Sequence, residues 1–124
     1  MSRRQAKRRE ARRFGQMAEW LCLWRLRLSG YQILVQNYRQ PVGEVDIIAR
    51  HGSLIAFIEV KARQSVDQAA EAIVAKQKQR IERAATAYLA TASLPENHQI
   101  RFDAMLVQPW RPIVWIRDAW RPDW

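Results

Sequence analysis

The stretch that decides the fold is GEVDIIARHGSLIAFIEVKAR, residues 43–63, in which charged side chains interrupt two of the most apolar runs of the chain. His51 and Gly52 form a turn signal, and residues 44–50 and 54–61 on either side of it have the composition of β-strands. The second strand begins as a nearly continuous apolar run, which is typical of a strand buried on both faces. We therefore expect a central sheet, and its charged members need an explanation: Glu44, Asp46, Glu59 and Lys61.

The rest of the chain supplies the elements around these two strands. Residues 15–29 lack proline and precede Gly30, which predicts a helix with a glycine after its end. Ser65–Gln68 fits a capping box that opens a second helix. The expected elements, in order, are a helix at 15–29, strands at 31–39, 44–50 and 54–61, a helix from 65 to about 92, and strands at 100–107 and 113–117. This order, α-β-β-β-α-β-β, indicates an α/β fold.

The turn between the two central strands predicts which face of the sheet their charged side chains occupy. A two-residue turn at His51 and Gly52 pairs Asp46 with Phe57 and Glu44 with Glu59. Period-two alternation then places all four charged side chains on one face. Carboxylates opposite each other repel, and Mg²⁺ or Mn²⁺ would neutralise them with the oxygen ligands available. Lys61 would either lie beside that metal or form only a salt bridge with Asp46 or Glu59, and the spacing favours neither.

Each helix also carries one polar residue among apolar neighbours. Glu19 lies within the apolar stripe of the first helix formed by Cys22, Leu23 and Leu26, opposite a second stripe of Met17, Leu21, Trp24 and Leu28. A buried acid needs a partner, which here is a metal ion or an ion pair with Arg39 or Arg50. Gln77 lies in the middle of the apolar face of the second helix: Ala70, Ile73, Val74, Ile81, Ala84 and Tyr88.

Composition limits the class of protein. A chain of 124 residues with 48% hydrophobic residues is enough for one domain. It has no apolar run long enough to span a membrane and no apolar signal segment, so we expect a cytoplasmic protein. Cys22 is the only cysteine, which excludes an internal disulfide and a cysteine-based zinc site.

The net charge of +9 is concentrated at the N-terminus, where residues 1–13 carry seven basic side chains and one acid. Since this run has no apolar periodicity, we expect a disordered basic arm followed by a single domain at 14–124. The arm, with Arg8 and Arg9, either attracts nucleic-acid phosphates or serves only as a solubilising extension. A second basic stripe on the later helix is either a solvated face or a phosphate track: Lys76, Arg80 and Arg83.

These residues carry a resemblance to a known family. GEVD followed by FIEVKAR, after GQMAEWLCLWRL and a strand ending in VQNYR, resembles the YraN-like family of small bacterial proteins. That family is similar in turn to archaeal Holliday junction resolvases of the PD-(D/E)XK nuclease superfamily. The resemblance covers residues 15–106 and includes FDAMLV near the end. It implies a restriction-endonuclease-like core, in which helices flank a central mixed sheet.

The resemblance also implies roles for individual residues. Asp46 matches the acid of the first motif, with Val45 where proline often lies, and Glu59 and Lys61 match E-x-K. Glu19 matches the first-helix acid that completes a metal site in many relatives, and Gln77 matches a glutamine beside it. The implied activity is Mg²⁺- or Mn²⁺-dependent hydrolysis of phosphodiester bonds in DNA, branched or single-stranded, with Asp46, Glu59 and Glu19 as metal ligands.

Two other classes of protein remain open from the sequence: a nucleic-acid-binding protein without catalysis, and an interaction module whose acidic cluster is structural. A nuclease and a nucleic-acid-binding protein would both need a basic surface, which we expect to comprise Arg63, the basic stripe and the arm. The resemblance to resolvases also implies a homodimer. Four tryptophans in the last 15 residues either stack on unpaired bases or, as we favour, pack in the core or a dimer contact: Trp110, Trp115, Trp120 and Trp124.

Overall fold

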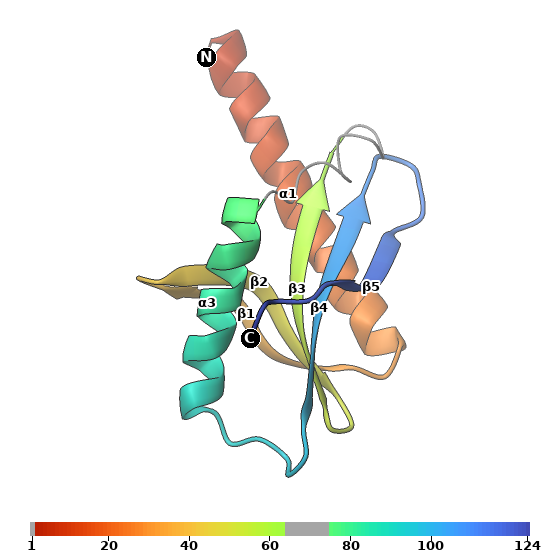
Figure 1. The fold of residues 1–124 in the computed structure, drawn as a ribbon. Helices are drawn as coiled ribbons and strands as arrows, with labels where there is room; N and C mark the ends of the chain where they lie inside the picture. Colours follow the sequence, from red (N-terminus) through yellow and green to blue (C-terminus); the bar gives the residue numbers. More distant parts are fainter. Residues whose placement is uncertain (1, 64–74) are drawn as a thin grey trace.

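One mixed sheet of five strands carries a helix on each face (Figure 1) in the computed structural model, which describes residues 2–63 and 75–124. The elements are α1 (Arg3–Leu28), β1 (Gln32–Gln40), β2 (Gly43–His51), β3 (Leu54–Ala62), α3 (Ala75–Thr91), β4 (Gln99–Val107) and β5 (Val114–Trp120). This confirms the predicted order and the restriction-endonuclease-like core. The predicted capping box at Ser65–Gln68 and the first turns of the second helix lie outside the described residues.

The strands lie in sequence order across the sheet, and β3 is at its centre. β3 and β4 run parallel, whereas the other neighbouring pairs are antiparallel. A parallel pair needs a crossover connection, and α3 lies on that path against one face of the sheet. The apolar start of β3 is buried from Ile55 to Ile58, as the sequence predicts for a strand covered on both faces.

Each helix covers its own half of the core. On one face α1 packs Ala18, Cys22 and Leu26 against alternate sheet residues such as Ile47 and Ile58. On the other face α3 packs Ile81, Ala84 and Ala85 against the residues between them, which include Ile48, Phe57 and Phe102. An aromatic stack continues across three strands of this face, with Phe57 on Phe102 at 27° and Phe102 on Trp120 at 29°. The sheet therefore holds the two helices in fixed positions relative to β3.

The hairpin between β2 and β3 turns one residue later than predicted. His51 pairs with Leu54 and Ile48 with Phe57, so the turn consists of Gly52 and Ser53, and Gly52 has a positive φ of 62°. The predicted pairing of Asp46 with Phe57 is therefore wrong by two residues. The register as observed, continued by one step, brings Asp46 opposite Glu59.

The first helix begins earlier than predicted. Residues 3–13, which the sequence analysis expects to be a disordered arm, are the N-terminal half of α1, and Ser2 and Gln5 form a capping box at its start. Arginine, lysine, alanine and glutamine are strong helix formers, so these residues can extend a helix that packing has already nucleated. The absence of an apolar face led to the wrong prediction, since only Ala6 is partly buried there. This half of α1 projects beyond the sheet (Figure 1).

The two apolar stripes predicted on α1 have different surroundings. Cys22, Leu23 and Leu26 are buried against the sheet, whereas the second stripe is exposed, with Met17, Trp24 and Leu28 at 58%, 45% and 82%. Among the described residues, no helix is long and apolar enough to cross a membrane.

Candidate active site

The candidate site lies where β2 and β3 separate. Their ladder ends at Ile47 and Ile58, and beyond it the main-chain N–H of Val60 donates to Oδ2 of Asp46 at 2.8 Å. Val45 and Ile48 both pack toward α3, so the alternation along β2 is interrupted between them and Asp46 turns toward α1. Asp46 is therefore held by the main chain of β3 at the end of the sheet.

Glu59 meets Asp46 at this point, and the two carboxyl groups share a hydrogen bond. Glu59 is only 6% exposed. Burial and, second, the negative charge of Asp46 raise the pKa of Glu59 to about 8. Burial also raises the pKa of Asp46, against the opposing effect of the Val60 N–H. At neutral pH the pair therefore holds one proton between its two carboxyl groups.

Lys61 and Gln77 both contact the same oxygen of Glu59. Lys61 Nζ lies 3.2 Å from Glu59 Oε1, and Gln77 Nε2 of α3 donates to that oxygen at 3.0 Å. The Lys61 side chain is 11% exposed, so the ion pair is largely shielded from water. The salt bridge that the sequence offered as one alternative is present, and it places the ammonium group beside the acid pair.

Glu19 faces the pair from α1 but stands apart from it. Burial and the charge of Asp46 raise the pKa of Glu19, while a hydrogen bond from Asn37 and the charge of Arg39 lower it. Across residues 2–63 and 75–124, no three His, Cys, Asp or Glu side chains come close enough together to hold a metal ion. The structure thus gives an Asp46–Glu59 pair with Glu19 nearby, and not the cluster of three ligands that the resemblance implies.

A hollow of about 560 Å³ opens next to the pair, between α1 and the ends of β1 and β3. Asp46, Lys61 and Glu19 line it together with three basic side chains, from α1, from β1 and from the residue after β3: Arg12, Arg39 and Arg63. A negatively charged group entering this hollow would meet these arginines and Lys61 beside the acids.

The other predicted site residues lie elsewhere. Arg8 and Arg9 are exposed on the projecting half of α1. Lys76, Arg80 and Arg83 do not line the hollow, and the main chain of Arg80 abuts Gly43. Glu44 forms an ion pair with its exposed strand neighbour Arg39. Glu44 does not line the hollow, although its partner Arg39 does, and it takes no part in the acid pair.

Asn37 is a site residue that was not predicted from the sequence. It lies inside β1 with a positive φ of 52°, a conformation that asparagine adopts more readily than most residues. Its side chain reaches Glu19 and lines the hollow. Asparagine is depleted in strand interiors, so its presence in YQILVQNYR was an available signal of an irregular strand.

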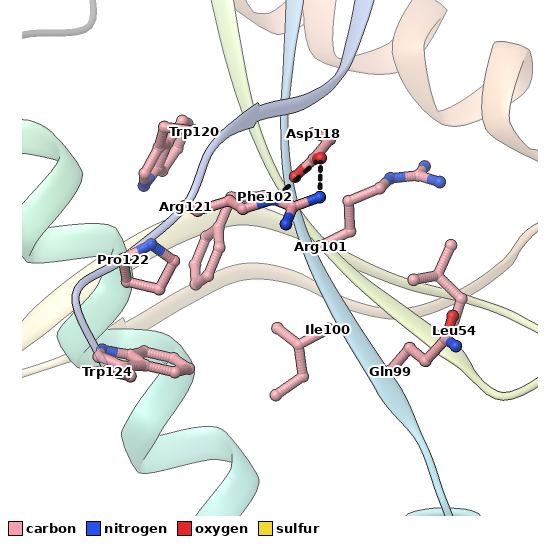
Figure 2. Close-up of a pocket in the computed structure, with 10 residues that line it drawn as sticks. All are labelled: Leu54, Gln99, Ile100, Arg101, Phe102, Asp118, Trp120, Arg121, Pro122 and Trp124. Atoms are coloured by element: carbon pink, nitrogen blue, oxygen red, sulfur yellow. Dashed lines mark hydrogen bonds and ion pairs between the residues drawn. The ribbon is translucent and has the colours of Figure 1, made fainter.

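A second hollow of about 610 Å³ lies at the other end of the sheet (Figure 2). Phe102 and Ile100 of β4 lie at its base, and Pro122 and Trp124 border it. Its arginines are already engaged, because Arg101 binds Asp103 and Tyr31 and Arg121 binds Asp118. It offers no pair of acids, so the chemistry of the chain points to the hollow at Asp46.

Comparison with known proteins assigns the chain to a family. The family described as "Uncharacterised protein family UPF0102" matches residues 18–107, which include the acid pair, Lys61, Glu19 and Gln77. The chain belongs to UPF0102. UPF0102 proteins similar to it include one from Paramagnetospirillum magneticum, 48% identical over 91% of both chains, and one from Mesorhizobium japonicum, 43% identical over 92% of this chain and 91% of the relative. One from Nitrobacter winogradskyi is 52% identical over 67% of this chain and 70% of the relative.

The predicted YraN-like family is thereby confirmed, and the matched residues include Asp46, Glu59 and Lys61. The match begins at residue 18, after the basic half of α1. The family description carries no activity, so the function has to be argued from the site.

Proposed function

We propose that this protein hydrolyses phosphodiester bonds of DNA, branched or single-stranded, with Mg²⁺ or Mn²⁺ as cofactor. The observation that supports it is the Asp46–Glu59 pair at the end of β3, where a buried and a partly buried carboxyl group share a hydrogen bond beside Lys61. Buried acids in contact are costly unless a proton or a cation neutralises them, and such pairs occur at functional sites.

The donor set fits a hard divalent cation. Mg²⁺ is bound by one or two carboxylates and completes its coordination with water and substrate phosphate, so two acids suffice. Asp46 and Glu59 would hold the ion, and Glu19, which lines the same hollow as Asp46, would assist through water. Such an ion polarises a phosphoryl oxygen and makes water a stronger nucleophile at neutral pH.

The side chains around the pair have tasks that follow from their contacts. Lys61, which pairs with Glu59, would position a water molecule or stabilise charge on the phosphate. Gln77 fixes the orientation of Glu59 from α3. Arg12, Arg39 and Arg63 attract the phosphate backbone to the hollow.

The test measures metal binding and cleavage in the same set of variants. Mg²⁺ should raise the unfolding temperature of the wild type, by the amount expected for a ligand bound only to the folded state. The stabilisation should disappear in Asp46→Asn and Glu59→Gln, and cleavage of branched, duplex or single-stranded DNA should fall at least about 100-fold. Glu44→Gln is the matched control, since it removes a nearby acid of β2 that is outside the pair.

Lys61→Ala separates catalysis from metal binding. An ammonium group ligates no cation, so this variant should lose cleavage and keep the Mg²⁺-dependent rise in unfolding temperature. A wild type that shows neither stabilisation nor cleavage would exclude the enzyme, and DNA binding indifferent to Mg²⁺ would then identify a binding protein.

A further inference from the structure

The basic half of α1 is continuous with the part of the helix that carries Glu19 into the hollow. At about 100° per residue, Arg8 and Arg12 both point within about 20° of the direction of Glu19. The structure agrees, because Arg12 lines the hollow with Glu19. Arg8 and Arg12 therefore form a row that leads along the helix to the acid pair.

The charge along this side of α1 is uninterrupted. Arg8 and Arg12 are exposed, and within the described residues no ion pair or hydrogen bond engages either guanidinium. Glu10, the only acid among residues 1–13, points about 180° away from Glu19. Of the other cations near these two residues, Lys7 and Arg13 point about 120° to either side, and Arg9 points about 80° away.

Gly15 leaves the helix surface bare between Arg12 and Glu19. A Cβ at this position would have nothing within 4 Å, so no packing inside the protein explains the glycine. Glycine without such a reason costs a helix interior about 0.5–1 kcal/mol relative to alanine. A bare surface beside the hollow allows an incoming strand to approach the helix closely.

We propose that Arg8 and Arg12 are a phosphate-binding row that holds one nucleic-acid strand as it leaves the hollow at Asp46 and Glu59. The two residues are separated by about 6 Å along the helix, so that both guanidinium groups can contact one strand. The row from Glu19 to Gln5 is about 21 Å long, which is enough for several phosphates of one strand. The proposal rests on the proposed function and adds the path of the substrate beyond the site.

A charge-matched pair of double variants tests the row. Arg8→Gln with Arg12→Gln removes two cations from it, and Lys7→Gln with Arg13→Gln removes two cations from the sides of the same helix turns. Binding is measured by fluorescence anisotropy in EDTA, with labelled thymidine oligomers of increasing length over a range of salt concentrations.

The first variant should lower the slope of log K against log[salt] by about 1.4, which corresponds to two phosphates bound on a single strand. It should also lose the gain in affinity with oligomer length that the wild type shows. The second variant should keep that gain and most of the slope.

Equal losses of affinity and salt slope in the two double variants, or no binding of the oligomers by the wild type, would contradict the proposed phosphate-binding row. This outcome differs from failure of the proposed function, because binding in EDTA requires neither metal nor cleavage. If the two double variants differ in binding but Mg²⁺ does not stabilise the wild type, the phosphate-binding row is supported and the proposed hydrolysis is not.

Discussion

The raised pKa of Glu59 should be visible in how the free energy of unfolding depends on pH. Its pKa in the folded protein is about 8, compared with an ordinary value of 4.5, because of burial and the charge of Asp46. Between these two values the folded state binds more protons than the unfolded state, so the free energy of unfolding falls as pH rises. The contribution is fully present below pH 4.5 and is lost through pH 8.

The metal-free wild type should therefore be less stable at pH 8 than at pH 5, and Glu59→Gln should flatten this dependence. The glutamine keeps an oxygen for Gln77 and Lys61 but removes the ionisation. We expect the variant to exceed the wild type at pH 8 by more than about 1.4 kcal/mol, the free energy of one pKa unit. Urea unfolding in EDTA at both pH values measures this, and a wild type that is more stable at pH 8 would contradict the raised pKa.

The sequence predicts the site residues whose chemistry and spacing both point to one site. Asp46, Glu59 and Lys61 stand out because charge in an apolar run is rare, and the structure brings them together. The role of Asn37 was not readable, since it depends on a positive φ that strand propensity argues against.

Gly43 and Gly15 have different structural roles, because only one of them lies against another element. The sequence marks Gly43 only as part of a turn, yet a Cβ there would lie 1.9 Å from the main-chain oxygen of Arg80. Gly43 is thus the place where α3 approaches the start of β2. Gly15, by contrast, lies in a helix with open space around it.

Gly15→Ala and Gly43→Ala should consequently change stability in opposite directions. The first should raise the free energy of unfolding by about 0.5–1 kcal/mol through helix propensity. The second should lower it by about 1–3 kcal/mol, because the helix must move away from the sheet. Chemical denaturation of both variants measures the difference. A neutral Gly43→Ala would show that α3 is not fixed against β2.

The hairpin register shows the limit of prediction for elements. The strands, their order and the burial of β3 follow from composition and period, which tolerate small shifts of boundary. The turn depends on whether His51 and Gly52 or Gly52 and Ser53 occupy its centre, and both choices offer a glycine. The predicted pairing therefore failed by two residues, although the two acids still meet.

Most of the net positive charge lies in the N-terminal half of α1, away from the hydrophobic core. Of the net charge of +9, residues 1–13 carry +6, and in the structure residues 3–13 form a helix outside the packed domain. Composition alone predicted this concentration of charge but not its rigidity, because helix continuity depends on the packing of the following residues against the sheet. A rigid basic helix directs its charge toward the site, which a disordered arm does not.

Deleting residues 1–13 should therefore weaken binding of nucleic acid without loss of the fold. These residues bury almost no apolar surface, so the free energy of unfolding should stay within about 0.5 kcal/mol of the wild type. Affinity should fall, and the slope of log K against log[salt] should shrink by about 0.7 for each phosphate of a single strand that the deleted residues bind. Urea unfolding and anisotropy titrations in EDTA measure the two effects separately. An unchanged salt slope would show that the basic half of α1 does not touch nucleic acid, and the charge would then act only on solubility.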